Sequence, residues 1–298
     1  MSASMSMSMS MSSSRRSSFV RSSSSSSRRR GLSRSERSWI SRSSTSSTTG
    51  STGEPGTLEE PKARPRPGEK KGFVEEMRIV AMKLHTREQA PKEGQAEMPK
   101  ERPKFAPTRD GYLAFLSESK EVYDTMETIM ANADADSAFA RFQGTGLERG
   151  DVLARDIDAM MSKYDLAKYE PSEDGPGRTY AKLLRELAEK DPPAFICHYY
   201  NVYFAHTAGG RMIGKMVSDK CLEGETLAFY QYPAADGGEQ TDEEEKERMK
   251  ELLGDVKATI DDVATGWTRD EKDHCLEETS KSFEYSGKLL KCIMTTSS

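Results

Sequence analysis

The stretch AFICHYYNVYFAHTAGGRMIG spans residues 194–214. Its first half is apolar or aromatic on nearly every side of a helix, which predicts a buried helix. Two adjacent glycines, Gly209 and Gly210, then interrupt it. Each glycine costs about 1 kcal/mol relative to alanine in a helix interior. The pair therefore indicates a bend or a close approach to the bare backbone, either by a neighbouring helix or by a flat ligand.

A second helix is predicted over GFVEEMRIVAMKLHT, residues 72–86, and it ends near His85. Apolar residues recur at helical spacing and form a stripe of Phe73, Met77, Val80, Ala81 and Leu84. His85 lies beside this stripe, where a histidine is either a core residue or a ligand. Together with the bare backbone of the first segment, it favours a planar ligand between two helices. Haem, with His85 as its axial ligand, fits that description.

The rest of the folded part is also predicted to be helical. Helices are expected over residues 110–130, 145–163, 178–190 and 268–294. Three Thr-x-x-Glu capping boxes begin at Thr145, Thr241 and Thr268. Alternating strand patterns and hairpin turns between β-branched runs are absent from the sequence. We therefore expect an all-α fold, a single domain of about seven or eight helices.

Composition narrows the classes of function. Residues 1–50 hold nine arginines and one glutamate, a balance of +8, which leaves −13 for the other 248 residues given the net charge of −5. An acidic body is a poor nucleic-acid binder. No run of about 18 apolar residues exists, so we expect no membrane span. The four widely spaced cysteines are typical of free thiols in a reducing compartment.

The N-terminal region has a different composition from the body. Residues 1–50 are rich in Ser and Arg and poor in acids, which is typical of an organellar transit peptide. The alternative is a low-complexity tail that carries no targeting signal. Residues 51–71 contain much Pro, Gly and charge and are predicted to be a linker. The folded domain is expected over residues 72–298.

Three long segments resemble plant and algal haem oxygenases: residues 73–86, 188–214 and 267–287. The likeness extends over residues 72–294. It implies an all-helical domain that holds haem between a proximal and a distal helix. It also implies ferredoxin-dependent cleavage of haem by O2 to biliverdin (the IXα isomer), Fe2+ and CO in the plastid stroma. Ferredoxin and a downstream bilin reductase would be the partners of a monomeric enzyme that supplies bilin synthesis.

The resemblance assigns roles to individual residues. His85 matches the proximal iron ligand, and Gly209 and Gly210 match the glycines of the distal helix. Arg78 matches a propionate contact, and it precedes His85 by two helical turns, or about 10 Å on one face. Further matches are Tyr200 and Lys257, as propionate contacts, and Phe283, as a wall of the distal pocket.

One position departs from part of the family. Animal and many bacterial relatives have an aspartate before the glycines that organises distal water, and this chain has His206 there. Either His206 or a water chain that reaches other groups would arrange that water. His198 and His274 are expected to be ordinary polar residues. The rival functions are a haem-binding but non-catalytic carrier or sensor, and a helical scaffold with no cofactor.

Overall fold

The computed structural model describes residues 66–98, 104–234, 238 and 240–294. The expected transit peptide and most of the expected linker lie outside these residues. The described residues form helices and no strand. An isolated β-bridge joins Thr86 and Ala96. This confirms the all-α fold. Within the described residues the α-helices are α1 Phe73–Leu84, α2 Arg109–Ala131, α3 Gly150–Tyr164, α4 Pro176–Lys190, α5 Pro192–Ala205, α6 Arg211–Cys221, α7 Asp242–Thr265, α8 Arg269–Glu277 and α9 Thr279–Lys291.

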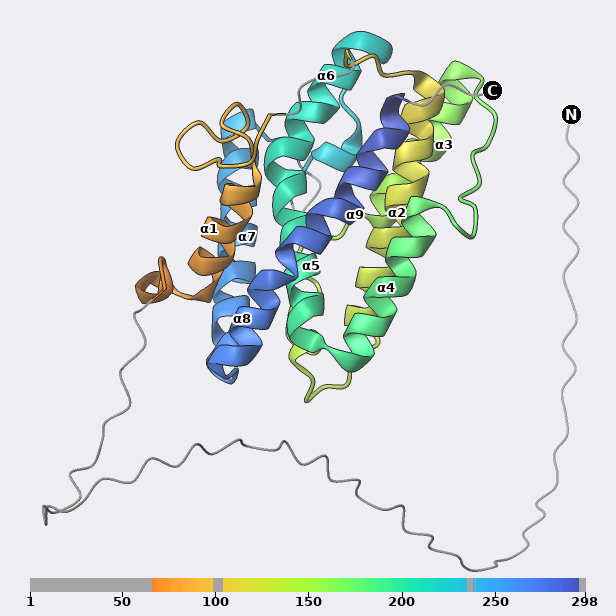
Figure 1. Cartoon of the computed structure of the whole chain (residues 1–298). Helices are drawn as coiled ribbons and strands as arrows, with labels where there is room; N and C mark the ends of the chain where they lie inside the picture. Colours follow the sequence, from red (N-terminus) through yellow and green to blue (C-terminus); the bar gives the residue numbers. More distant parts are fainter. Residues whose placement is uncertain (1–65, 99–103, 235–237, 239, 295–298) are drawn as a thin grey trace, which may run out of the picture. The chain divides into compact units, whose positions relative to one another are not determined.

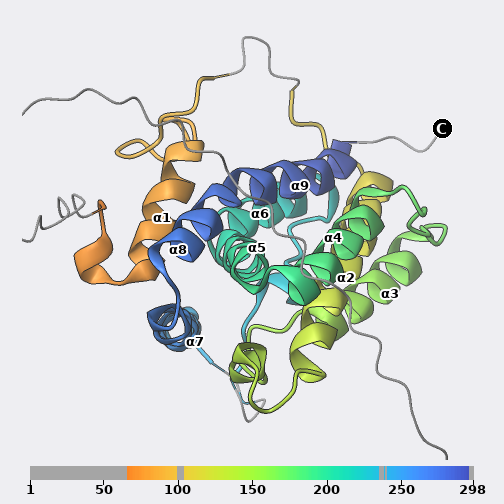
Figure 2. The ribbon, with the colours of Figure 1, turned by 60° about the horizontal axis from the view of Figure 1, so that its bottom comes forward.

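Helix α5 is central to the bundle, and α6 continues its direction (Figure 1). Viewed end-on, α5 has α1 on one side and α2, α3 and α4 on the other, while α9 crosses beside it (Figure 2). Its sequence explains this place, because every residue from Ala194 to Tyr203 is buried. A helix that is apolar on all sides gains most free energy when other helices surround it.

Helix α1 is attached to α7 and α8 at its N-terminal end. The Val74 N–H donates to the Asp261 carboxylate of α7 at 2.8 Å. Gly72, with φ of 109°, brings the chain against the same carboxylate, where an added Cβ would lie 2.5 Å from an oxygen. The rings of Phe73 and Trp267 pack edge to face at 5.6 Å. These contacts fix the start of the helix that ends at His85.

Two predicted helix starts are confirmed and one is wrong. Thr241 and Thr268 form complete capping boxes at the starts of α7 and α8. Thr145 and Glu148 also make capping contacts, but α3 begins only at Gly150. The reason is a tertiary contact: the Glu127 carboxylate of α2 accepts the Arg149 and Gly150 N–H groups, at 2.6 and 3.1 Å.

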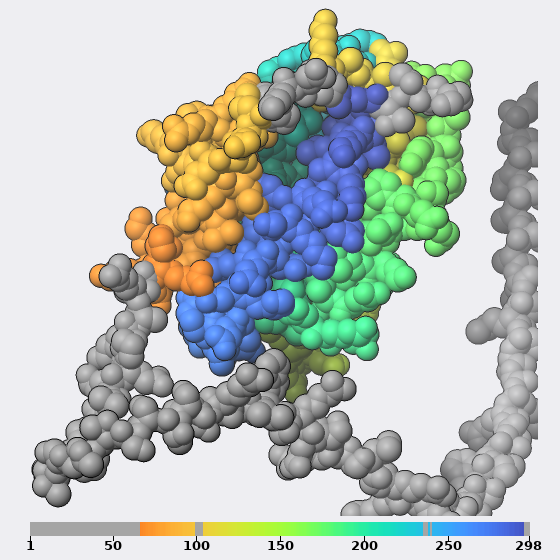
Figure 3. Space-filling view, viewed as in Figure 1, coloured from red at the N-terminus to blue at the C-terminus, as the bar shows by residue number. Residues whose placement is uncertain are grey.

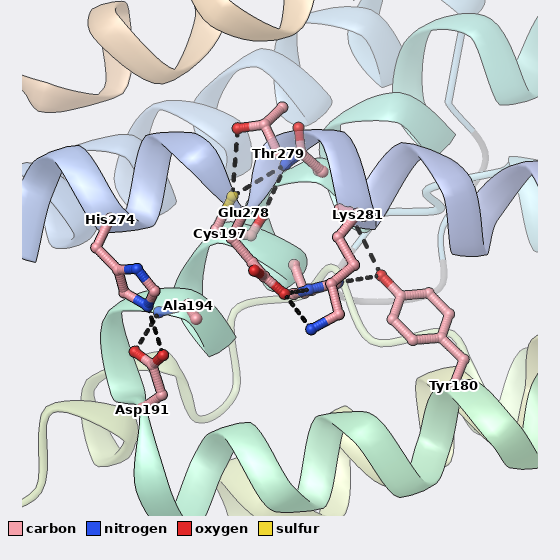
Figure 4. Close-up of polar contacts among 11 residues, drawn as sticks. Tyr180, Asp191, Ala194, Cys197, His274, Glu278, Thr279 and Lys281 are labelled. Carbon is pink, nitrogen blue, oxygen red and sulfur yellow. Dashed lines mark hydrogen bonds and ion pairs between the residues drawn. The ribbon is translucent and has the colours of Figure 1, made fainter.

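The helix expected over residues 268–294 is interrupted at Glu278, which separates α8 from α9. The Glu278 carboxylate accepts from His198 Nε2 of α5 at 3.0 Å and pairs with Lys281 at 3.0 Å. This polar network, which includes Tyr180 of α4, holds α5 between α8, α9 and α4 (Figure 4). The break explains in part why the described residues contain nine α-helices and not seven or eight.

The folded body begins a few residues earlier than expected. Glu69–Lys71, assigned to the linker from sequence, form a short 3₁₀ turn, η1. Arg66, just before this turn, forms an ion pair with Asp273 of α8. No helix among the described residues has the length and apolar character needed to cross a bilayer.

Candidate haem site

His85 lies where α1 ends, with extended backbone angles of φ −78° and ψ 149°. Its side chain is half-buried, and Nδ1 lies 2.9 Å from the Ala81 carbonyl oxygen. Because a carbonyl only accepts, Nδ1 carries the proton and Nε2 keeps its lone pair. No described residue takes up that lone pair. In the neutral form of this ring, Nε2 is the nitrogen that can bind iron.

Phe283 of α9 packs against His85, with ring centroids 5.2 Å apart and planes at 87°. The resemblance implied a place in the wall of the distal pocket. That role stays a prediction. Packed edge to face, Phe283 restricts rotation of the imidazole.

The distal segment is a π-helix, η3 His206–Gly210, inserted between α5 and α6. The wider π turn adds a residue to the helix and is frequent at functional sites. An added Cβ at Gly209 would meet no atom within 4 Å, so the backbone there faces open space. The predicted interruption at the glycines is therefore present, as a π segment and not as a loop.

The exposed side of this segment is apolar. Ala205 and Ala208 are exposed, as is Gly209. One turn on, Met212 and Met216 are 61% and 38% exposed. Figure 3 shows the teal surface of this region set back between α1 and α9. An apolar surface in a recess is suited to a flat apolar ligand.

The three predicted propionate contacts are Arg78, Tyr200 and Lys257. Arg78 pairs with Glu75 at 2.9 Å and with Glu93 at 2.7 Å. Burial raises the pKa of Tyr200, and the positive charge of Arg78 partly offsets that rise. Lys257 lies over the Phe204 ring at 5.5 Å, and that ring packs on Tyr200 at 4.4 Å.

Two basic residues lie near the Glu75 carboxylate. Hydrogen bonding from Arg78 is the main cause that lowers the pKa of Glu75, and the charge of Lys257 contributes. Arg78 and Lys257 come from α1 and α7, so the fold alone brings them together. Their charges suit a ligand with carboxylates at one edge.

His206 is placed differently from the sequence expectation. It is buried, and its Nε2 donates to the Phe229 carbonyl at 2.9 Å. Burial lowers its pKa to about 3, so the ring is neutral at neutral pH. Its ring packs on Phe229 at 4.2 Å and on Tyr230 at 5.3 Å. A neutral, enclosed imidazole is a poor proton donor at neutral pH.

Sequence reasoning missed the residues behind the distal segment. Asp156 of α3 accepts the N–H groups of Phe229 and Ala228 at 2.6 and 3.2 Å. Gly214 lies so close to Tyr230 that an added Cβ would be 2.5 Å from the ring. No local pattern marks these positions, because each matters only through contacts distant in sequence.

Comparison with known proteins agrees with this geometry. Residues 73–291 match the family model described as heme oxygenase. The chain is 48% identical over 244 residues to heme oxygenase 1, chloroplastic, of Arabidopsis thaliana, which covers 80% of each chain. It is 34% identical over 246 residues to the probable inactive heme oxygenase 2, chloroplastic, of the same plant, over 76% of this chain and 77% of that one.

Among solved structures, heme oxygenase-2 from Synechocystis in complex with heme and NO has the same fold. The TM-score is 0.53 at 15% identity, over 74% of this chain and 85% of that chain. At that identity the likeness concerns the fold alone. The family match covers most of the chain, and the chain therefore belongs to the haem oxygenase family.

Proposed function

We propose that this protein is a haem oxygenase that uses O2 to cleave haem to biliverdin, Fe2+ and CO. Two features of the structure support the proposal: Nδ1 of His85 at the end of α1 is bound to the Ala81 carbonyl, and the bare backbone at Gly209 of η3 faces open space. Haem supplies the iron that activates oxygen and is itself the ring that is cleaved, and the protein supplies orientation and electrostatics.

On the proximal side, His85 is held as a neutral ligand. The Ala81 carbonyl fixes the tautomer through Nδ1, and Phe283 packs edge-on against the ring. A neutral imidazole donates less electron density than a thiolate, which would favour early cleavage of the O–O bond. This weaker donor suits a reaction in which oxygen must reach the porphyrin ring before that bond breaks.

On the distal side, Gly209 and Gly210 let the backbone approach a planar ligand closely. The nearest titratable group to these glycines in η3 is His206, which is neutral and turned toward Phe229. The distal segment thus offers steric confinement and no strong acid. We infer that ordered water, and not a side chain of η3, delivers protons in the pocket.

At the edge, Arg78, Tyr200 and Lys257 are placed to hold the two propionates. The ion pairs of Arg78 and the position of Lys257 over Phe204 support this assignment. Fixing the propionates fixes the rotation of haem in its plane. That rotation determines which meso carbon faces the confined oxygen, and we propose the α carbon.

The cellular setting follows from the relatives and from the sequence. The 48%-identical plant relative is named chloroplastic, and residues 1–50 have the composition of a transit peptide. We propose that the enzyme works in the chloroplast stroma and receives electrons from reduced ferredoxin. Biliverdin would then pass to a bilin reductase.

A haem titration of the folded body, followed by O2 and reduced ferredoxin, tests the proposal. The enzyme forms a Soret band at one haem per chain and converts it to biliverdin absorbance, with CO released. A Soret band that persists under turnover conditions would instead indicate a non-catalytic carrier. This outcome is included because the 34%-identical relative is named a probable inactive heme oxygenase. No Soret band at all would indicate a scaffold.

A further inference from the structure

Residues 86–97, here called the strap, fold back onto the end of α1 (Figure 1). The Ala96 N–H donates to the His85 carbonyl at 3.1 Å, and the Gln95 N–H donates to Lys83 at 3.2 Å. Gly94 makes the fold-back possible, since an added Cβ would lie 2.7 Å from the His85 oxygen and would overlap the Thr86 carbonyl. The strap thus has a defined position relative to His85.

That position places Glu93 on Arg78. The Glu93 carboxylate accepts from both terminal nitrogens of the guanidinium, at 2.7 and 3.3 Å. Glu75, on α1 itself, accepts from Nε and from one terminal nitrogen, at 2.9 and 3.1 Å. These contacts use four of the five N–H groups of Arg78. A third carboxylate can therefore bind Arg78 by two hydrogen bonds only if one of the two glutamates leaves.

Glu93 is the partner that can leave. Its side chain is 45% exposed, whereas that of Glu75 is 22% exposed. Glu75 lies three residues before Arg78 on one helix, so its contact is local. Glu93 reaches Arg78 only through the fold of the strap, and an exposed ion pair of this kind is weak enough to exchange.

We propose that Glu93 occupies the place of a haem propionate on Arg78 and that haem binding exchanges one carboxylate for the other. The inference rests on the proposed function, specifically on Arg78 as a propionate contact. The exchange makes and breaks no covalent bond. Before haem arrives, Glu93 keeps Arg78 paired and correctly oriented. The bound ligand must offer a carboxylate that competes, so the strap selects for porphyrins with free propionates.

Stopped-flow haem association tests this with Glu93→Gln, matched by Glu97→Gln. Both variants remove one negative charge from the strap, and Glu97 is exposed. We expect Glu93→Gln to bind haem about two- to five-fold faster and more tightly, the range that a half-exposed ion pair supports. Glu97→Gln should match the parent protein. Unchanged or weaker haem binding by Glu93→Gln would overturn the proposal.

Two further arms assign the effect to the exchange. In an Arg78→Gln background, Glu93→Gln should add nothing, because no exchange remains. With the dimethyl ester of haem, which lacks propionate charges, the gain should also vanish. A gain that persists in either arm, or that Glu97→Gln shares, would reduce the effect to general electrostatics and overturn the inference.

The failure of the proposed function would look different. In that case the parent protein itself would show no histidine-ligated Soret band. If the band forms but Arg78→Gln binds haem as well as the parent, then the proposed function survives and the exchange is wrong. Thermal unfolding of each variant confirms that the compared proteins are folded.

Discussion

The two sides of the haem site are built in contrasting ways. The proximal side is a helix end where His85 projects a side chain and the surroundings are charged and half-exposed, as at Arg78 and Glu93. The distal side projects no side chain at Gly209, and a buried aromatic layer around His206 supports it from behind. One side presents a side chain at the end of a helix, and the other presents bare backbone with an aromatic layer behind it.

The difference follows from what each side must do. A ligand and a propionate contact must be reachable from solvent when haem enters, so weak, exposed pairs suffice. The distal backbone must stay in an unfavourable π geometry without haem, so it needs strong support. Asp156 supplies part of that support through two N–H groups of η4 Ala228–Tyr230, whose Phe229 carbonyl accepts from His206.

The largest expected effect comes from His85→Ala. Loss of the axial ligand should remove the spectrum of five-coordinate, histidine-ligated haem and lower turnover by at least about 100-fold. Absorption and resonance Raman spectra of the haem complex, with biliverdin formation, measure this. His274→Ala is the control, because His274 pairs with Asp191 away from the recess. An unchanged haem spectrum in His85→Ala would end the assignment.

Two glycines on the distal side should respond in opposite ways. At Gly209 a side chain meets no protein atom, so Gly209→Leu should leave the free energy of unfolding within about 1 kcal/mol of the parent. It should nevertheless weaken haem binding by about tenfold or more and slow biliverdin formation, because it fills the recess. Normal biliverdin formation by this variant would show that Gly209 does not face haem.

Gly214→Ala is the counterpart. Its Cβ would lie 2.5 Å from the Tyr230 ring, so this variant should unfold about 1–3 kcal/mol more easily. Chemical denaturation of both variants without haem provides the comparison. Equal stability of the two would contradict the view that the distal backbone is open in front and tightly packed behind.

On the proximal side, Gly94→Ala should disturb the strap without unfolding the bundle. The added methyl group would overlap the Thr86 carbonyl, at a local cost of about 1–3 kcal/mol. Faster hydrogen exchange over residues 83–96 and weaker haem binding should follow. Gly254→Ala in α7 is the control, since a Cβ there meets nothing within 4 Å. If Gly94→Ala exchanges its amide hydrogens as slowly as the parent, then the strap does not depend on the close approach of Gly94 to the Thr86 carbonyl.

The smallest expected effect is on the pH dependence of stability. Burial lowers the pKa of His206 in the folded protein to about 3, from 6.5 in the unfolded chain. Below pH 6.5 the unfolded chain therefore binds a proton that the folded protein does not. The contribution to stability is complete above pH 6.5 and falls as pH falls toward 3, by about 1 kcal/mol between pH 6.5 and 5.5.

His206→Gln should flatten that decline, and His274→Gln should steepen it. The reason is the opposite sign: hydrogen bonding to Asp191 raises the pKa of His274, so its contribution is present at low pH and lost as pH rises through the folded value. Denaturant unfolding from pH 5.5 to 7.5 measures both. A parallel slope for His206→Gln and the parent would contradict the burial of a neutral ring.

Local sequence patterns predicted where most helices lie. They did not predict where contacts with distant residues delay or interrupt a helix. The apolar face of residues 109–131 and the capping boxes at Thr241 and Thr268 depend on near neighbours in sequence, and the structure contains them. The late start of α3 depends on Glu127, and the break at Glu278 coincides with its contact to His198. Those partners lie 22 and 80 residues away, beyond the reach of any local rule.

The same division applies to the site. His85 and the glycine pair could be selected from the sequence, because a histidine beside an apolar stripe and two glycines in a buried helix each break a local expectation. The resemblance to haem oxygenases added Arg78. Phe283 was selected through the resemblance, and its contact with His85 appears only in the structure. His206 was selected for distal chemistry, and its partner Phe229 was not foreseen, because a histidine in sequence does not reveal which way its ring turns.

By itself, the sequence predicted a helical domain with a glycine pair in a buried helix, and its resemblance to haem oxygenases assigned the iron ligand to His85. Periodicity, caps and glycine placement act over a few residues, so they can be read directly. The tertiary structure alone decided that Glu93 pairs with Arg78, that His206 is enclosed and neutral, and that Asp156 supports the distal segment from behind. Those outcomes depend on burial and on contacts between distant segments, which exist only once the helices have packed.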